Sequence, residues 1–398
     1  MKTLWNRLRR YLRWLVLIVI VLVVIAAVLF WRATIPATPS AFYTPPGTLA
    51  AGEPGTIIRS EPITNNVPDG AVAWRILYLT TGVNDEPVAV SGVVVAPAGE
   101  SATPRPVVAW AHGTVGVIPE CGTSHLNDPF KYIPEVDLMV REGFVVAATD
   151  YPGLGTPGVH PYLVGPVEAA SVLDSVRAAR QLDVNAGDRF VVWGGSQGGH
   201  ATLWTAQSAG TYAPELTLLG AAASAPAIDL PGILQSGFDK RVGAILTSEA
   251  LYAWSHVYPG VSLDNMVKPE YRERFENVAR TCITTPAALL TLGNIPTPSE
   301  FLAADPLTTE PYQTLIAENV PDGPIDVPIL ISHGTGDLII PFEGSEAEAA
   351  RRCAAGEDVQ FVRYPGVPHD ASAESGLMTV GWIEDRFAGR PTGSTCGS

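Results

Sequence analysis

The sequence predicts an α/β protein with a mostly parallel, doubly wound sheet and an inserted helical cap, preceded by one N-terminal transmembrane helix. Three observations predict this class. Short apolar runs alternate with helix-forming stretches, as strands alternate with crossover helices. About 100 residues separate the apolar runs near residues 224 and 328, which is too many for an ordinary connection. An uncharged apolar run of 18 residues lies close to the N-terminus.

The N-terminal run, Trp14–Trp31, has the length of a membrane-spanning helix. Eighteen helical residues extend about 27 Å, close to the roughly 30 Å of a bilayer core. Residues 1–32 hold six basic side chains and no acidic one, and five of the six precede the run. The positive-inside rule therefore places residues 1–13 in the cytoplasm, as a basic segment, and the body outside. We expect residues 14–31 to be a transmembrane signal anchor.

A cleaved secretory signal peptide is the alternative interpretation. The run exceeds the usual apolar core of such a signal, but small residues near Ala33 and Ala37 leave a cleavage site open. A buried core helix is disfavoured because the run is not amphipathic. Residues 32–56 are rich in Pro, Gly, Ala and Thr, and we expect a tether there. Both main interpretations export the body, either membrane-anchored with an extracytoplasmic domain or secreted after cleavage.

The composition fits a large globular domain and disfavours a nucleic-acid partner. Of the 398 residues, 46% are hydrophobic and 16% are charged, which supplies a sizeable core. The 38 glycines and 35 prolines favour a loop-rich enzyme over a helical bundle. The net charge is −15, and the part after residue 32 carries −21, with 19 basic and 40 acidic residues. Phosphate binding needs a basic face, which this balance does not favour.

Four cysteines, Cys121, Cys282, Cys353 and Cys396, indicate disulfides rather than a metal site. None belongs to a CxxC motif, so a zinc site is disfavoured. An even number of cysteines in an exported protein favours two disulfides. Four cysteines allow three pairings, and the residues alone do not choose among them.

We expect the α/β domain to occupy residues 57–398, with the cap at about 225–325. The turn Gly82–Asp85 predicts a hairpin between strands 71–81 and 86–97. Six further apolar runs are typical of strands buried on both faces: 106–113, 143–153, 189–199, 216–227, 327–337 and 359–370. Helices are expected at 168–182, 199–209 and 344–355.

Gly194–Gly198 matches the G-x-S-x-G pattern and places Ser196 at its centre. A strand-like run precedes the motif and a helix-like run follows it, which is the setting of a nucleophile elbow. The glycines allow a sharp turn that pushes the serine hydroxyl out at the strand end, near a helix N-terminus. A glycine-rich turn with an idle serine is the structural alternative. In the catalytic interpretation Ser196 is the nucleophile, and it needs a base.

In this fold the acid and then the histidine follow the serine in the chain. His369 lies in the loop after the last strand-like run and is the preferred base, with His256 and His333 as rivals. Asp337 ends the seventh strand-like run and can hold His369 in the required tautomer. The rival acids are Asp305, Asp322 and Asp326, none of which follows that run, and Asp370, which adjoins His369 and would point elsewhere.

The tetrahedral intermediate needs oxyanion donors. One is expected to be the backbone N–H of Gln197, the residue after the nucleophile. The other should come from the loop after the strand at 106–113, where Thr114 is preferred because its hydroxyl adds a further donor. Gly113 is the rival, and His112 is expected to shape the turn.

Several segments together resemble the secretory lipase family, the lipase A type of the α/β-hydrolase superfamily. The most specific is DYPGLGTPGVHPY at 150–162; AHGT (111–114), GGSQGG (194–199), HGTGDLIIP (333–341) and GVPHD (366–370) fit in order. The resemblance covers roughly residues 45–396. It implies an α/β-hydrolase fold, a cap that forms much of the acyl pocket, a triad of Ser196, Asp337 and His369, and no cofactor. The membrane anchor departs from the plain secreted pattern.

The resemblance also implies disulfides between Cys121 and Cys282 and between Cys353 and Cys396. We expect a serine carboxylic-ester hydrolase that acts through an acyl-enzyme on neutral esters, with a hydrophobic tunnel built from cap stretches 244–258 and 286–292. An acyltransferase with the same triad, or a non-catalytic binding protein of this fold, is the alternative. The expected partners are a small-molecule ester or lipid and, through the N-terminal helix, a membrane; no metal is expected. The natural ester, its chain length and the oligomeric state are left open.

Overall fold

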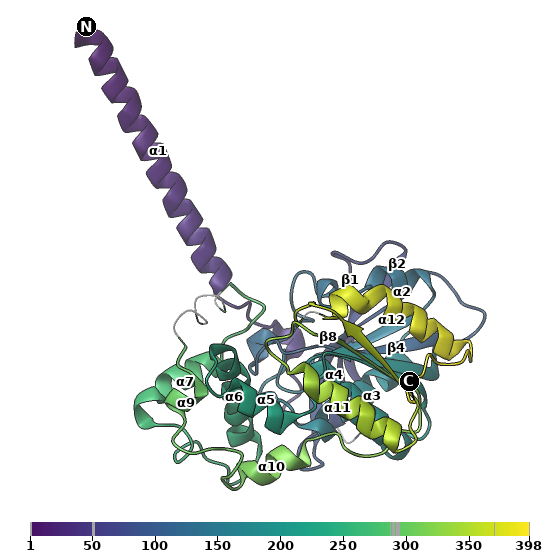
Figure 1. Cartoon of the computed structure of the whole chain (residues 1–398). Coiled ribbons are helices and arrows are strands. Elements are labelled where there is room, and N and C mark those ends of the chain that lie inside the picture. The colour runs from purple at the N-terminus through teal and green to yellow at the C-terminus, as the bar shows by residue number, and fades with distance from the viewer. Residues whose placement is uncertain are drawn as a thin grey trace.

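One mixed sheet organises the body of the protein (Figure 1). The computed structural model describes residues 2–49, 52–286, 288, 291, 295–369 and 371–397. Within these residues nine strands form the sheet in the order β1-β2-β3-β5-β4-β6-β7-β8-β9. The strands are β1 Ile57–Ile63, β2 Ala71–Thr81, β3 Pro87–Pro97, β4 Arg105–Ala111, β5 Val145–Thr149, β6 Ala186–Gly195, β7 Thr217–Ser224, β8 Ile329–Gly334 and β9 Val359–Tyr364.

In this order, each strand from β1 through β2 and β3 to β5 pairs antiparallel with the next. From β5 through β4, β6, β7 and β8 to β9 the neighbouring strands are parallel. The predicted α/β class is therefore confirmed, and the hairpin of β2 and β3 lies where the turn at 82–85 predicts it. Strand β1 was not expected. It is an edge strand that contains Pro62, and no residue of β1 is fully buried, so it lacks a strong apolar pattern.

Helices cover both faces of the sheet, as a doubly wound fold requires (Figure 1). Helices α3 (Gly165–Ala179) and α4 (Gln197–Tyr212) share the core on one face. Helix α11 (Phe342–Ala354) joins α4 there. On the other face α2 (Val136–Arg141) and α12 (Ala371–Phe387) contribute to one apolar cluster. The expected helices at 168–182, 199–209 and 344–355 correspond to α3, α4 and α11.

The segment between β7 and β8 is helical in its described part, and we use the term cap for residues 225–325. Its apolar cluster includes Tyr162, Leu163 and Val164 from the body, so the cap packs on the loop before α3. Of the predicted apolar stretch 286–292, residues 287, 289, 290 and 292 lie outside the described residues. The described cap helices are α5 Leu230–Gly237, α6 Arg241–Val257, α7 Arg272–Ala279, α9 Pro298–Phe301 and α10 Tyr312–Glu318.

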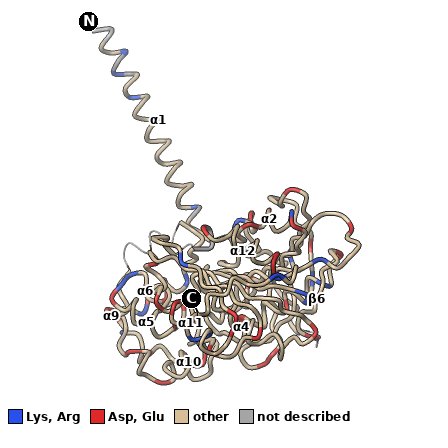
Figure 2. Tube along the Cα trace, turned by 45° about the vertical axis from the view of Figure 1, so that its right-hand side comes forward, with Lys and Arg blue, Asp and Glu red and all other residues tan. Residues whose placement is uncertain are grey.

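Helix α1, Lys2–Thr34, extends away from the body (Figure 1). Its part Trp5–Arg32 is long and apolar enough to cross a membrane by length and composition, and its apolar side chains are exposed. Basic residues lie toward its two ends, while acidic residues are spread over the body (Figure 2). A secretory signal meets the same criteria, so the anchor at 14–31 stays a prediction.

Two disulfides connect distant parts of the chain, in the pairing that the family resemblance implies. Cys121 pairs with Cys282 across 161 residues, which links the segment after β4 to the cap just after α7. The Ile283 N–H donates to the Val115 carbonyl beside this bond, over 3.1 Å. Cys353 of α11 pairs with Cys396 near the C-terminus.

Replacing Cys121 and Cys282 together by serine should lower the free energy of unfolding by about 2–4 kcal/mol, because the link restricts the unfolded chain. The matched control, Cys353→Ser with Cys396→Ser, removes a bond across 43 residues. The chain-entropy model predicts a loss about 1 kcal/mol smaller for this shorter loop. Urea unfolding followed by tryptophan fluorescence measures both losses. Parental stability of the first double variant would contradict the prediction.

Candidate active site

The turn between β6 and α4 holds Ser196 in an unusual backbone conformation. Its φ is 56° and its ψ is −118°, outside the regions that side-chain-bearing residues usually adopt. The flanking glycines are needed for close packing. A Cβ on Gly198 would lie 1.9 Å from the Ala111 carbonyl oxygen, and one on Gly194 would lie 2.2 Å from the Gly198 oxygen. The G-x-S-x-G segment thus forms the elbow that its pattern predicts.

Three side chains that follow strands of the parallel part of the sheet form a chain of hydrogen bonds. Ser196 follows β6, Asp337 follows β8 and His369 follows β9. The His369 Nε2 lies 2.9 Å from the Ser196 Oγ, and its Nδ1 lies 2.6 Å from the Asp337 Oδ2. Because a carboxylate only accepts, Nδ1–H donates to Asp337 and Nε2 is left to accept the serine proton. This is the arrangement that a serine nucleophile and its base require.

Asp337 is fixed by more donors than the histidine alone. The His333 Nε2–H donates to its Oδ2 over 2.9 Å, and the N–H groups of Ile339 and Ile340 donate to Oδ1 over 2.7 and 3.0 Å. Burial raises the pKa of Asp337, but hydrogen bonds from His333 and His369 outweigh it and hold that pKa below its usual range. The carboxylate therefore stays ionised beside His369.

His333, a rival base in the sequence analysis, contacts the acid and not the serine. It is fully buried, and its Nδ1 lies 2.7 Å from the Ser345 Oγ. Its position four residues before Asp337 was visible in the sequence, but the contact depends on how the chain turns after β8. The other rival base, His256, lies in α6, and its Nδ1 contacts the Tyr252 carbonyl at 2.8 Å.

The rival acids lie apart from the hydrogen-bonded group of Ser196, His369 and Asp337. Asp305, Asp322 and Asp326 are exposed, whereas an orienting acid of this kind is buried. Asp370 lies outside the described residues.

The loop after β4 lies beside Ser196. Gly113 and Thr114 line the same pocket as Ser196 and His369. His112 faces backbone carbonyls with both ring nitrogens, at 2.7 Å from Gly113 and 3.2 Å from Asp150, which fits its expected role in shaping the turn. In the described part of the chain the backbone N–H groups of Gly113, Thr114 and Gln197 have no acceptor. They are therefore available to an oxygen in the pocket.

Two cavities meet at Ser196. The first has a volume of about 290 Å³. Its lining includes Ser196, His369 and Thr114, together with apolar residues of the cap. The second has a volume of only about 20 Å³, is almost wholly apolar and lies between the body and the cap. The cap residues are Val242, Ile245, Leu246 and Ile283 in the first cavity, and Ala227, Leu230, Ile233, Leu234, Leu246, Ala250, Trp254 and Ile316 in the second.

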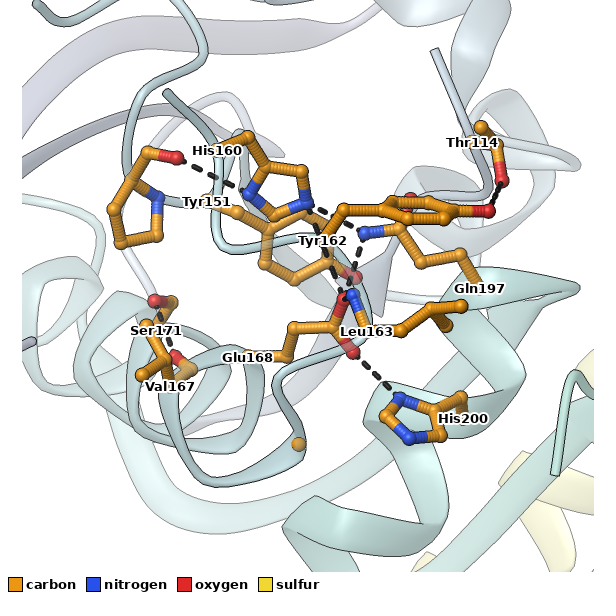
Figure 3. Close-up of polar contacts among 12 residues, drawn as sticks. Thr114, Tyr151, His160, Tyr162, Leu163, Val167, Glu168, Ser171, Gln197 and His200 are labelled. Carbon is orange, nitrogen blue, oxygen red and sulfur yellow. Dashed lines mark hydrogen bonds and ion pairs between the residues drawn. The ribbon is translucent and has the colours of Figure 1, made fainter. Parts of the chain in front are cut away.

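A buried polar network lies behind the elbow, and the sequence analysis did not identify it (Figure 3). Glu168 of α3 is at its centre. Its Oε1 accepts from the Gln197 side-chain Nε2 over 2.7 Å and from the Leu163 N–H over 3.1 Å, and its Oε2 accepts from His200 Nδ1 over 2.7 Å. The other His200 nitrogen faces the Asn319 carbonyl at 2.7 Å. Both His200 nitrogens therefore face hydrogen-bond acceptors, one on α3 and one in the cap.

His160 completes this network from the DYPGLGTPGVHPY segment. Burial lowers the pKa of His160 to about 4, although the nearby Glu168 partly offsets the effect. The ring is therefore neutral. Its Nδ1–H donates to the Pro152 carbonyl over 3.1 Å, and its Nε2 accepts from the Gln197 amide over 2.7 Å. Gln197 is thus held on one side by a carboxylate and on the other by a neutral imidazole.

Known proteins are similar in sequence to this chain over most of its length. A protein of Mycobacterium tuberculosis described as a probable inactive lipase is 27% identical over 392 residues, which covers 90% of this chain and 85% of the relative. A secreted triacylglycerol lipase of Malassezia globosa is 25% identical over 383 residues, which covers 89% of this chain and 82% of that relative.

Solved structures show the same fold. Lipase A of Candida antarctica superposes with a TM-score of 0.78 at 20% identity, over 91% of this chain and 89% of that one. The rice cell wall degrading esterase LipA of Xanthomonas oryzae superposes with a TM-score of 0.69 at 22% identity, over 84% and 98%.

The family model that matches the chain is that of the secretory lipases, over residues 135–395. This match spans well over half of the sequence and includes Ser196, Asp337 and His369. The protein therefore belongs to the secretory lipase family and has the α/β-hydrolase fold.

Proposed function

We propose that the protein is an extracytoplasmic serine carboxylic-ester hydrolase that acts on neutral esters with an acyl chain. The observation that carries the proposal is the hydrogen-bonded series Ser196–His369–Asp337 at the meeting point of two mainly apolar cavities. Membership of the secretory lipase family supports ester hydrolysis outside the cell. The relative described as probably inactive makes a direct test of activity necessary.

In the first half of the reaction His369 Nε2 takes the proton of Ser196 as Oγ attacks the ester carbonyl carbon. The carbonyl oxygen becomes an oxyanion, and the backbone N–H groups of Gln197 and Thr114 donate to it, with Gly113 as the rival donor. His369 then gives its proton to the leaving alcohol as the C–O bond breaks. Asp337 stabilises the imidazolium in the meantime. The product is an acyl-enzyme on Ser196.

In the second half water replaces the alcohol. His369 removes a proton from the water, the hydroxide oxygen attacks the acyl carbon, and the proton returns to Ser196 Oγ as the acid leaves. An alcohol in place of water would give transesterification, so the ratio of acid to new ester separates a hydrolase from an acyltransferase. The intact series of three residues argues for catalysis and against a non-catalytic binding protein.

The mainly apolar lining of the two cavities supports a substrate whose acyl chain is the part that the protein binds. The first cavity, of about 290 Å³, is lined by Val242, Ile245 and Leu246 beside Ser196, and the second, of about 20 Å³, continues from Ser196 between apolar side chains of α5, α6 and α10. Burying a methylene in such a cavity contributes about 0.8 kcal/mol. The strongly acidic body disfavours anionic substrates at long range, although salt screens this effect.

Ser196→Ala should lower ester turnover at least about a thousandfold, because the nucleophile is removed while the fold persists. Ser208→Ala, in the same helix but away from the pocket, is the control and should keep parental turnover. Hydrolysis of p-nitrophenyl butyrate and labelling by an organophosphonate measure the effect. Near-parental turnover in Ser196→Ala would show that another group performs the chemistry.

The specificity constant kcat/KM should rise from p-nitrophenyl acetate to at least the hexanoate, by up to about fourfold per methylene until the cavity is filled. Ala250→Leu narrows the second cavity and should reduce the hexanoate value while leaving the acetate value close to parental. Steady-state kinetics over the ester series provide the measurement. A flat or falling series beyond acetate would indicate a small polar pocket and an acetyl esterase.

The full-length protein should stay with membranes after high-salt and carbonate washing, because the helix at 14–31 is proposed to be an uncleaved anchor. A form that begins at residue 33 and follows a cleavable signal is the control and should appear in the soluble fraction. N-terminal sequencing of the mature full-length protein provides the second measurement. A mature N-terminus near residues 34–38 would establish cleavage instead.

A further inference from the structure

We propose that Tyr162 is a positioning residue that directs the Thr114 hydroxyl toward the oxyanion. This inference rests on the proposed ester hydrolysis and extends it to a residue outside the hydrogen-bonded series at Ser196. It also gives the last residue of the DYPGLGTPGVHPY segment a role. Figure 3 shows the two side chains beside Gln197, whose backbone N–H is the other expected donor.

The contact that carries the proposal joins two hydroxyl groups. The Thr114 Oγ1 lies 2.8 Å from the Tyr162 OH. Tyr162 is 1% exposed, whereas Thr114 is only half-buried and lines the cavity that contains Ser196 and His369. The Tyr162 hydroxyl is therefore enclosed in the core, and the Thr114 hydroxyl lies at the surface of the pocket.

The direction of the hydrogen bond follows from the surroundings. Each hydroxyl has one proton to donate. Among the described residues the Tyr162 hydroxyl has no partner other than Thr114, and leaving a buried donor unsatisfied costs about 1–3 kcal/mol. Tyr162 therefore donates to Thr114 Oγ1. The hydroxyl proton of Thr114 is then free to point away from Tyr162, and the pocket is the direction left open to it.

Two backbone hydrogen bonds and one ring contact hold Tyr162 in place. The Trp254 Nε1–H of cap helix α6 donates to the Tyr162 carbonyl over 2.9 Å, and the Tyr162 N–H donates to the His160 carbonyl over 2.8 Å. The rings of His160 and Tyr162 pack edge to face with centroids 6.1 Å apart. Burial, with the nearby Glu249, raises the pKa of Tyr162 well above its usual value, so the phenol keeps the proton it donates.

The same segment therefore supports both sides of the oxyanion site. His160 accepts from the Gln197 side chain, and Tyr162 donates to Thr114. Removing a donor that touches an oxyanion typically costs about a hundredfold or more in kcat. Tyr162 acts only through Thr114, so losing its single hydrogen bond should cost less, about tenfold.

The test combines Tyr162→Phe with Thr114→Val in a double-mutant cycle. Tyr162→Phe removes one oxygen and keeps the ring in the apolar cavity; it should lower kcat for p-nitrophenyl butyrate about tenfold with KM changed less than about twofold. Thr114→Val should lower kcat about a hundredfold. The double variant should match Thr114→Val alone, and Thr114→Ser should keep activity that remains sensitive to Tyr162→Phe.

Tyr78→Phe is the matched control, since Tyr78 is also fully buried and its hydroxyl lies 2.6 Å from a threonine hydroxyl, that of Thr149. It lines neither cavity at Ser196 and should lose stability without losing kcat. A parental kcat in Tyr162→Phe, or a further tenfold loss in the double variant, would overturn the role of Tyr162. Absence of Ser196-dependent turnover in the parent would instead overturn the proposed function and this inference with it.

Discussion

The left-handed backbone at Ser196 is the constraint on which the rest of the site depends. Such a conformation costs free energy, and it persists only where the surroundings determine it fully. Here the Ser196 N–H donates to the Ser224 carbonyl over 2.8 Å, and the Ser196 carbonyl accepts from the N–H groups of Gly199, His200 and Ala227. The elbow is thus tied at once to β7, to the first turn of α4 and to the start of the cap. The side chain has little freedom except to face the pocket.

Two buried carboxylates stabilise the two sides of this elbow in similar ways. Asp337 accepts from two histidines and two backbone N–H groups, and Glu168 accepts from Gln197, His200 and one backbone N–H. In both cases the desolvation of a charge is offset by several short hydrogen bonds. The first orients His369, and the second fixes the side chain of Gln197, the residue next to Ser196.

The sequence predicted those parts of the site that are governed by local rules. The glycines around Ser196 follow from the geometry of a strand-to-helix turn, and the order of serine, aspartate and histidine is the one this fold uses, so Ser196, Asp337 and His369 could be singled out. Contacts such as His333 with Asp337, or Tyr162 with Thr114, join segments whose approach is set by tertiary packing. Strand β1 was missed for a related reason, because an edge strand needs little apolar alternation. The choice of cysteine pairing came from family resemblance and not from spacing.

The bond between Cys121 and Cys282 has a topological consequence. It closes a covalent ring that contains Ser196 and the first half of the cap, whereas Asp337 and His369 lie outside the ring. A protease that cut one peptide bond in the cap between residues 225 and 281 would leave the two fragments covalently joined. The segment that carries Ser196 would then stay attached to the segment that carries Asp337 and His369. In the proposed extracytoplasmic enzyme, such a nick need not separate the halves of the candidate active site.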